Sequence, residues 1–201
     1  MTWTYTDKNV RIAKLNVGEY DNCVYVVACA TTGSAVIIDA ADEADRVLAA
    51  CEEVQVEAIL ETHGHFDHLQ ALDAVKDALG VPWFMHLADV DIAEREPDGP
   101  IEHGQVFAVG NVALHALHTP GHTPGSVSFV LEPVVFSGDT LFPGGPGATR
   151  WDYSSFGQIM DSVEQHLFTL PAPTIVYPGH GAATTIGIEK PHADEWRARG
   201  W

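Results

Sequence analysis

The chain has 201 residues, of which 46% are hydrophobic and 19% are charged, as is typical of a folded globular protein. Its formal net charge of −18 and its lack of a Lys/Arg cluster argue against a nucleic-acid partner, because acidic surfaces repel phosphate. No apolar run reaches the roughly 18 residues of a membrane span, and the N-terminus has no signal-peptide pattern. We therefore expect a single domain over residues 1–201, located in the cytoplasm, with no membrane partner.

The first part of the chain predicts strands followed by alternating helices and strands. Apolar residues at helical spacing predict helices over 42–54 and over 69–80, the second of which ends at Gly80. Alternating or apolar runs predict strands over residues 10–17, 22–29, 35–40, 56–62 and 81–86. The three cysteines lie in these elements without a CxxC pair, so we expect buried apolar side chains at Cys23, Cys29 and Cys51.

The second part of the chain continues in the same style. Strand-like runs cover 105–119, 126–140 and 174–180, and a helix is predicted over 156–170 before a polar tail. Strands interleaved with helices in this way predict an α/β layered fold whose sheets are covered by helices. The longest irregular segment is 141–156, and loops of that length are commonly functional.

The densest group of titratable side chains is THGHFDH, residues 62–68, at the end of a predicted strand. Residues two apart on a strand point to the same side, so His63 and His65 can converge on one ion. A turn after His65 would let Asp67 and His68 face a second ion. Neutral imidazole and carboxylate are ligands that zinc, iron and manganese accept, so this motif predicts a metal site. The alternative is a solvated loop that is rich in histidine.

Three later segments place further ligand types directly after strand-like runs. GHTPGS contains His122, SGDTLF contains Asp139, and PGHG contains His180. Each is flanked by glycine, which allows the tight turns that aim a side chain. With the first motif they supply five histidines and two aspartates, enough for two adjacent metal sites that share one carboxylate.

The ordered set HGHFDH, GHTPGS, SGDTLF and PGHG resembles the metallo-β-lactamase-fold hydrolases, and among them the compact glyoxalase II-like branch (hydroxyacylglutathione hydrolase-like). The resemblance covers roughly residues 10–190. It implies an α/β fold, a four-layer αββα sandwich with the site at one edge between the two sheets. Because only residues 181–201 follow His180, we expect no appended helical substrate domain.

The resemblance also implies a role for each polar residue of the motifs. Asp67 would act in catalysis as well, by accepting a hydrogen bond from the attacking hydroxide. Asp39 would orient the histidine loop without binding metal, with a helix N-cap as the alternative reading of that residue. The implied ligands are His63, His65 and His122 for the first ion, Asp67, His68 and His180 for the second, and Asp139 as the bridge between them.

The implied cofactors are two divalent metal ions, zinc first, with iron or manganese as alternatives. Two such ions about 3.5 Å apart make a bridging water nucleophilic. The retained ligands favour hydrolysis of a small-molecule thioester of the hydroxyacylglutathione type. β-Lactam hydrolysis is disfavoured because β-lactamases of this fold generally lack the bridging aspartate. The net charge likewise disfavours RNA processing.

Two other functions stay open from the sequence. A persulfide dioxygenase would use one iron held by His63, His122 and Asp139, with Arg150 as a possible counterpart of a basic residue in that family. A sensor domain would bind metal without turnover.

The remaining aromatic and histidine residues give weaker predictions. We expect Arg150, Trp151 and Tyr153, with Phe142, to contact substrate from the loop 142–156. The alternative is that Trp151 and Tyr153 fill the core. Six histidines outside the motifs are expected to be structural or exposed: His86, His103, His115, His118, His166 and His192.

Overall fold

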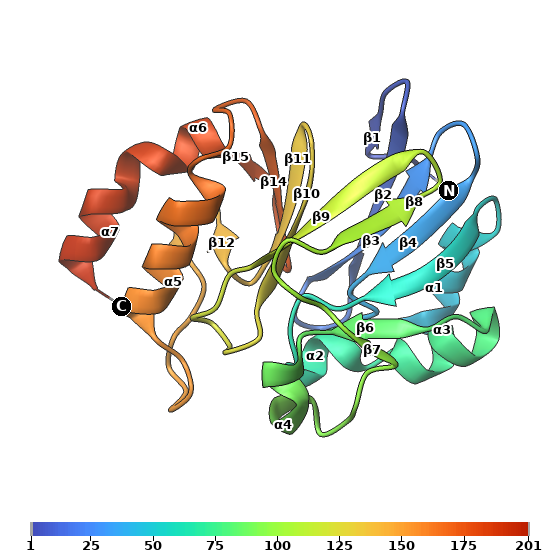
Figure 1. The fold of residues 1–201 in the computed structure, drawn as a ribbon, viewed down its shortest axis with the longest axis horizontal. Helices are drawn as coiled ribbons and strands as arrows, with labels where there is room; N and C mark the ends of the chain where they lie inside the picture. The colour runs from blue at the N-terminus through green and yellow to red at the C-terminus, as the bar shows by residue number, and fades with distance from the viewer. Residues whose placement is uncertain (1, 201) are drawn as a thin grey trace.

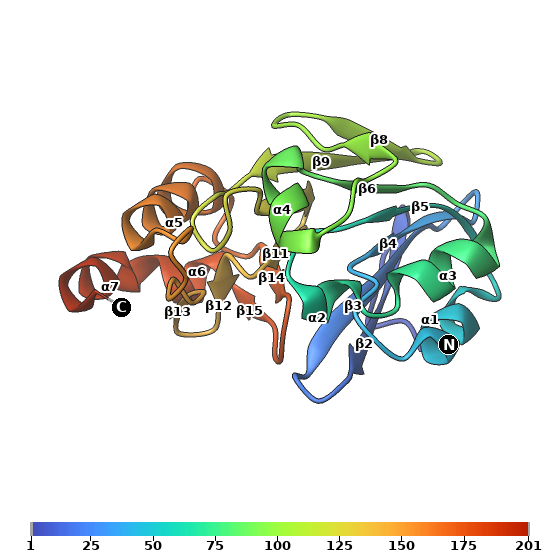
Figure 2. The ribbon, with the colours of Figure 1, turned by 90° about the horizontal axis from the view of Figure 1, so that it is seen from below.

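A computed structural model describes residues 2–200 and has four layers, with two β-sheets face to face and helices on both outer faces (Figures 1 and 2). The α/β sandwich predicted from the sequence is confirmed. No helix among the described residues is both long and apolar enough to cross a bilayer.

The first sheet has seven strands within residues 2–200, ordered in space as they are in the chain. Their bounds are Tyr5–Thr6 (β1), Val10–Val17 (β2), Asn22–Cys29 (β3), Ser34–Ile38 (β4), Gln55–Leu60 (β5), Trp83–Met85 (β6) and Gly99–Pro100 (β7). Neighbours from β1 to β4 are antiparallel, whereas β4 to β7 are parallel. The carboxyl ends of β4, β5 and β6 therefore lie at one edge of this sheet.

The second sheet has the order β15-β14-β11-β10-β9-β8. The strands of this half are Val106–Val109 (β8), Val112–His118 (β9), Val127–Leu131 (β10), Val134–Gly138 (β11), Ile175–Pro178 (β14) and Thr184–Thr185 (β15), with a small separate hairpin of Leu141–Phe142 (β12) and Gly145–Pro146 (β13). The runs 105–119 and 126–140 each form a hairpin instead of a single strand, with tight turns at Gly110–Asn111 and Glu132–Pro133. β9 and β11 are both antiparallel to β10, and β14 is parallel to β11, so β9, β11 and β14 point the same way.

Seven helices lie within the described residues: Ala44–Cys51 (α1), Phe66–Leu69 (α2), Leu72–Leu79 (α3), Val90–Ala93 (α4), Phe156–Ser162 (α5), Ile186–Glu189 (α6) and Ala193–Arg199 (α7). α1 is shorter than the predicted 42–54: it begins only at Ala44, because Glu43 adopts a left-handed conformation immediately before it, and it ends at Cys51. α3 ends at Gly80 as predicted, and α5 continues into a π-helical segment, Val163–Leu167.

Three buried apolar clusters hold the layers together. Along β3, Tyr25 and Val27 pack between the sheets, whereas Val24 and Val26 pack under α1 and α3. A third cluster joins the second sheet to α5 and α7 through residues such as Trp196. Burying one such side chain contributes about 1.5–3 kcal/mol, so these faces fix the stacking of the layers. The three cysteines are buried and unpaired, as predicted.

Candidate metal centre

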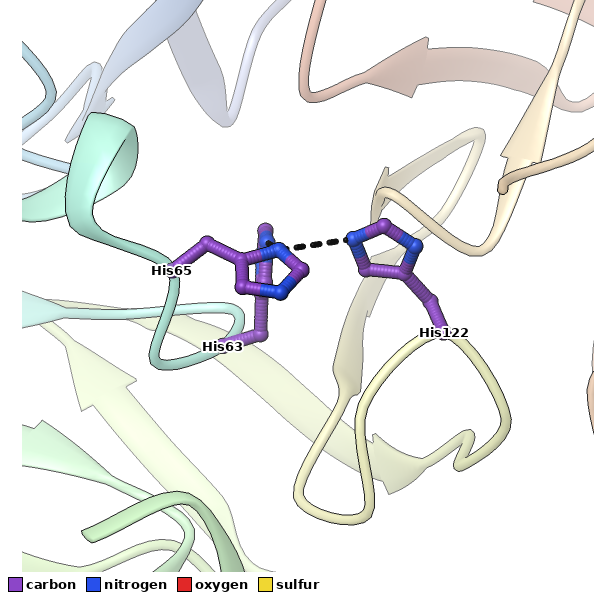
Figure 3. A group of neighbouring side chains, drawn as sticks. All are labelled: His63, His65 and His122. Atoms are coloured by element: carbon purple, nitrogen blue, oxygen red, sulfur yellow. Dashed lines mark hydrogen bonds between the residues drawn. The ribbon is translucent and has the colours of Figure 1, made fainter. Parts of the chain in front are cut away.

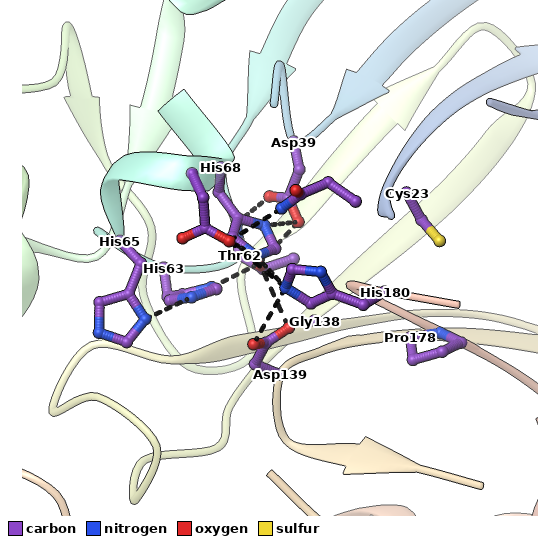
Figure 4. Close-up of polar contacts among 12 residues, drawn as sticks. Cys23, Asp39, Thr62, His63, His65, His68, Gly138, Asp139, Pro178 and His180 are labelled. Atoms are coloured by element: carbon purple, nitrogen blue, oxygen red, sulfur yellow. Dashed lines mark hydrogen bonds and ion pairs between the residues drawn. The ribbon is translucent and has the colours of Figure 1, made fainter. Parts of the chain in front are cut away.

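The candidate centre lies where strand ends of the two sheets meet. In each sheet the relevant strands point the same way, so the residues that follow them gather at one edge. These residues are Asp39 after β4, His63 and His65 after β5, His122 after β9, Asp139 after β11 and His180 after β14. Ligands that are far apart in the chain are therefore neighbours in space (Figure 4).

The histidine loop corrects one step of the sequence prediction. β5 ends at Leu60, so His63 and His65 do not converge through the alternation of a strand. The backbone leaves the sheet because the N–H groups of Thr62 and Gly64 donate to buried carboxylates at 2.7 and 2.8 Å. The chain turns after His65 into α2, as predicted.

The first group of ligand atoms consists of three imidazole nitrogens (Figure 3). His65 Nδ1 lies 3.1 Å from His63 Nε2 and 3.0 Å from His122 Nε2. Nitrogens bound to one tetrahedral zinc at about 2.0–2.1 Å would be about 3.3 Å apart. The three rings thus surround a volume that suits one such cation.

The outer nitrogens of these rings determine which inner nitrogens are unprotonated. His122 Nδ1–H donates to the carbonyl of Ala148 at 2.7 Å, so its Nε2 presents a lone pair. The Thr62 hydroxyl donates to Asp39 at 2.8 Å, so it accepts from His63 Nδ1–H at 3.0 Å. His63 Nε2 therefore also presents a lone pair to the centre.

These protonation states fit a bound cation. A proton on His65 Nδ1 could bridge to His63 or to His122, but not to both at full strength. Burial, followed by the charges of the neighbouring imidazoles, lowers the pKa of His63 well below its usual range, and lowers that of His65 to about 4. A lone pair on His65 Nδ1 is repelled by those of His63 and His122, each about 3 Å away, and a metal ion removes this repulsion.

The second group contains Asp67, His68 and His180. His68 Nε2 lies 3.2 Å from His180 Nε2, and Asp67 Oδ2 lies 3.5 Å from His180 Nε2. Each side chain has its own outer partner. Asp39 Oδ2 accepts from His68 Nδ1 at 3.0 Å, and the Tyr20 carbonyl accepts from His180 Nδ1 at 2.8 Å. The remaining contact is the Asn22 amide, which donates to Asp67 Oδ2 at 3.0 Å.

Electrostatics around the second group differ from those around the first. Burial opposes charge on His68, but the carboxylates of Asp39, Asp139 and Asp67 outweigh it and raise the pKa of His68 to about 10. Burial likewise opposes charge on His180, yet its contacts with Asp139 raise its pKa. In the metal-free centre this group therefore holds a proton that a metal ion must displace.

Asp139 lies between the two groups. Its Oδ2 is 3.4 Å from His122 Nε2 and 3.5 Å from His180 Nε2, and its Oδ1 is 3.6 Å from His68 Nε2. Burial alone would raise the pKa of Asp139, but the neighbouring imidazoles lower it well below its usual range. Oδ1 is buried, and no described residue donates a hydrogen bond to it. An unsatisfied buried carboxylate oxygen beside five imidazoles fits a shared metal ligand.

Asp39 anchors the histidine loop and does not cap a helix. Its carboxylate accepts from the backbone and hydroxyl of Thr62 and from His68, while Glu43 occupies the N-cap of α1. These contacts place Asp39 behind the ligands, in the position expected of an orienting residue.

A cavity of about 680 Å³ opens over the ligands. Tyr20, Phe66 and Phe142 line it together with the three predicted substrate residues. The Trp151 ring centroid is 4.5 Å from that of His65, and the Tyr153 hydroxyl is 2.8 Å from His65 Nε2. Tyr153 is 38% exposed, and Trp151 is half-buried and lines the cavity, so neither side chain fills the core.

The histidines outside the motifs belong to neither of the two ligand groups described above. His118 stacks on His86, with ring centroids 4.2 Å apart, and donates to the carbonyl of Pro124 at 2.8 Å. Sequence reasoning missed Asn22 and Asp89, two buried polar residues near the centre. Asp89 follows β6 at the same edge as Asp39 and His63, but no local pattern in its segment of the sequence marks it.

Comparisons with known proteins agree with this geometry. Residues 18–180 match the family model described as the metallo-beta-lactamase superfamily. The hydroxyacylglutathione hydrolase GloC of Haemophilus influenzae is 32% identical over 78% of this chain and 84% of its own length.

Solved structures show the same arrangement of the chain. BLEG-1, a B3 metallo-β-lactamase, is 31% identical with a TM-score of 0.81, over 90% of this chain and 97% of BLEG-1. TTHA1623, solved in a di-iron-bound form, is 32% identical with a TM-score of 0.80, over 89% and 96% of the two chains. ETHE1 of Myxococcus xanthus is 32% identical with a TM-score of 0.81, over 90% and 82%.

Proposed function

Because this chain belongs to the metallo-β-lactamase superfamily, we propose that it is a dinuclear metallohydrolase acting on a small-molecule thioester of the hydroxyacylglutathione type. The ions we propose are two zinc ions, with iron or manganese as alternatives. His63, His65 and His122 would hold the first ion, Asp67, His68 and His180 the second, and Asp139 both. When bound, the ions would supply Lewis acidity for the carbonyl and for a nucleophilic water.

The observation that best supports two metal positions is that the second group of candidate ligands has orienting contacts of its own. His68, His180 and Asp67 are held by Asp39, the Tyr20 carbonyl and Asn22. Of these three partners, Asp39 also reaches the first group, through the Thr62 hydroxyl and His63. Residues left over from a lost metal position would not need such support. Outer contacts of this kind orient metal ligands and typically change metal affinity about 10- to 100-fold.

Other side chains around the cavity would orient the attacking water or contact the substrate. Asn22 donates to Asp67 Oδ2, which leaves Asp67 Oδ1 free of that contact to orient an attacking water. Trp151 presents an aromatic face beside His65, suited to an acyl or thiol group. Arg150 lies 4.9 Å from the Trp151 ring centroid, and no described carboxylate forms an ion pair with it. In a chain of net charge −18, this free cation suits a carboxylate of the thiol carrier.

Persulfide dioxygenation is the alternative, supported by the likeness to ETHE1 across most of both chains. It would need only the iron ligands His63, His122 and Asp139. The orientation of the second group counts against it, because an enzyme with one iron makes no use of that group.

Parallel assays of metal-free protein reloaded with zinc, iron or manganese test the proposal. We expect release of free thiol from acyl-glutathione thioesters, with two ions per chain. Oxygen consumption on glutathione persulfide by protein with one iron, without thioester cleavage, would establish the dioxygenase. Hydrolysis of a β-lactam but no thioester, the reaction class of BLEG-1, would also contradict the proposal, as would two bound ions without any turnover.

A further inference from the structure

Asp89 is a fully buried carboxylate that touches both loops of the first ligand group. It follows β6, at the end of a 3₁₀ turn over Leu87–Asp89, and is 0% exposed. It lies in neither ligand group, and the mechanism proposed above does not use it. A buried charge requires several donors, so the partners of Asp89 show what it holds in place.

Its two oxygens accept three hydrogen bonds from two distant segments. Oδ2 accepts from the backbone N–H of Gly64 at 2.8 Å and from the hydroxyl of Thr123 at 2.6 Å. Oδ1 accepts from the backbone N–H of Gly125 at 2.6 Å. Gly64 lies between His63 and His65, and Thr123 follows His122. One carboxylate therefore ties together the two loops that contain all three histidines of the first group.

The approach of these loops to Asp89 leaves no room for side chains. A Cβ on Gly64 would lie 2.7 Å from the Asp89 carbonyl oxygen, and one on Gly125 would lie 2.7 Å from Asp89 Cγ. Both contacts are far below normal separations, so both glycines are needed for the loops to reach the carboxylate. This accounts for the glycines in HGH and in HTPG through packing against one residue.

We infer that Asp89 is a positioning residue that sets the spacing of His65 and His122 and so tunes metal affinity at the first position alone. Charge-assisted hydrogen bonds to backbone N–H groups are short and strong, so they fix loops well. The inference rests on metal binding at the centre and not on the identity of the substrate. Its test therefore uses metal affinity, and it stands or falls separately from thioester hydrolysis.

The test is Asp89→Asn, measured by equilibrium titration of metal-free protein with zinc and cobalt(II). An amide has the shape of a carboxylate, but its NH₂ group must face at least one of the three donors. To separate the positions, the substitution is combined with His180→Ala, which keeps the first position, and with His122→Ala, which keeps the second. We expect zinc affinity to fall about 10- to 100-fold in the first background and to change less than about threefold in the second.

Cobalt(II) absorption gives a second readout, because distorted coordination at the first position alters the visible spectrum without requiring turnover. Thr123→Val removes one hydrogen-bond donor and should also lower zinc affinity at the first position. Thr123→Ser keeps the hydroxyl and should keep that affinity. The matched control is Asp98→Asn, because Asp98 accepts from the backbone N–H of Trp83 at 3.0 Å away from both loops.

Three results would overturn the inference. Equal loss in both backgrounds would show a general loss of structure, and unchanged affinity in both would show that the loops keep their spacing without Asp89. If Asp89→Asn does not fold, the two Thr123 variants decide the matter. Zinc affinity at the first position that is as weak in Thr123→Ser as in Thr123→Val would contradict the role of the hydroxyl.

Discussion

The two halves of the centre contain similar ligands but have opposite electrostatics. His63, His65 and His122 lie among other imidazoles, and burial lowers the pKa of each of them. His68 and His180 lie among carboxylates, which raise their pKa values. The comparison shows that histidine ligands can have two protonation states before metal binds. They are neutral in the first half, whereas the second half holds a proton that must be released when the metal binds.

The halves also differ in how they are anchored. Asp39 contacts a ligand ring directly, through His68 Nδ1, whereas Asp89 contacts only backbone N–H groups and a hydroxyl in the loops beside the ligands. Rings of both halves have outer partners, and the first half is held in addition by a carboxylate that joins its two loops. Asp139 belongs to both halves, so a substitution there should affect both metal positions at once.

Asp139→Ala should therefore have the largest effect. Removing the shared carboxylate should cost both ions and reduce kcat/KM for thioester hydrolysis by about 10³-fold or more. Elemental analysis and thiol-release kinetics measure the two effects. His115→Ala is the matched control, because His115 is exposed on β9 and should change neither. Retention of two ions and full rate by the Asp139 variant would show that the bridge is misassigned.

His180→Ala separates the two halves. It should lower the metal content from two ions to one and reduce hydrolysis about 10²-fold or more, because one of the two Lewis acids is lost. Elemental analysis and kinetics are read on the same sample. A dioxygenase would keep its iron and its oxygen consumption in this variant, and that outcome would favour a mononuclear enzyme.

Asp39→Asn should act mainly on the second half. Loss of the carboxylate behind His68 should weaken zinc binding at that position about 10- to 100-fold. Zinc titrations in the His122→Ala background measure this position alone. An effect limited to the His180→Ala background would reverse the assignment of Asp39.

The pH dependence of metal binding should differ between the halves. Protonated His68 must lose its proton to bind, so zinc affinity at the second position should rise with pH until about 10, the pKa of that ring. At the first position all three histidines have lowered pKa values, about 4 for His65, so this position should keep its affinity to lower pH than the second. Calorimetric titrations with zinc, in two buffers with different ionisation enthalpies, measure the number of protons released on binding. Equal proton release at both positions would contradict the comparison.

Arg150→Ala should have the smallest effect. Loss of one exposed cation should raise KM up to about fivefold and leave kcat nearly unchanged, because an exposed ion pair contributes up to about 1 kcal/mol. Arg46→Ala, a paired surface arginine, is the control. An unchanged KM would remove Arg150 from the substrate site.

The sequence predicted which candidate ligands would gather better than it predicted why they meet. His122, Asp139 and His180 could be placed because each follows a strand-like run and precedes a glycine-rich turn. Strand alternation predicts the convergence of His63 and His65, but side-chain carboxylates hold that loop outside the sheet. Such contacts depend on which strand ends are neighbours, and local patterns contain no information about that.

Asp89 shows this limit most clearly. Its segment, HLADVD, has no glycine, no histidine pair and no motif spacing, and its partners lie 25 and more residues away in the chain. Only the parallel order of β4, β5 and β6 places it beside the histidine loop. The same order explains why Asp39 could be found, since it directly ends a predicted strand.

The most direct test is anomalous diffraction from crystals of the zinc-loaded protein. Two zinc peaks should flank the Asp139 carboxylate, one among His63, His65 and His122 and the other among Asp67, His68 and His180. A single peak at full occupancy, or zinc bound away from Asp139, would contradict the dinuclear centre.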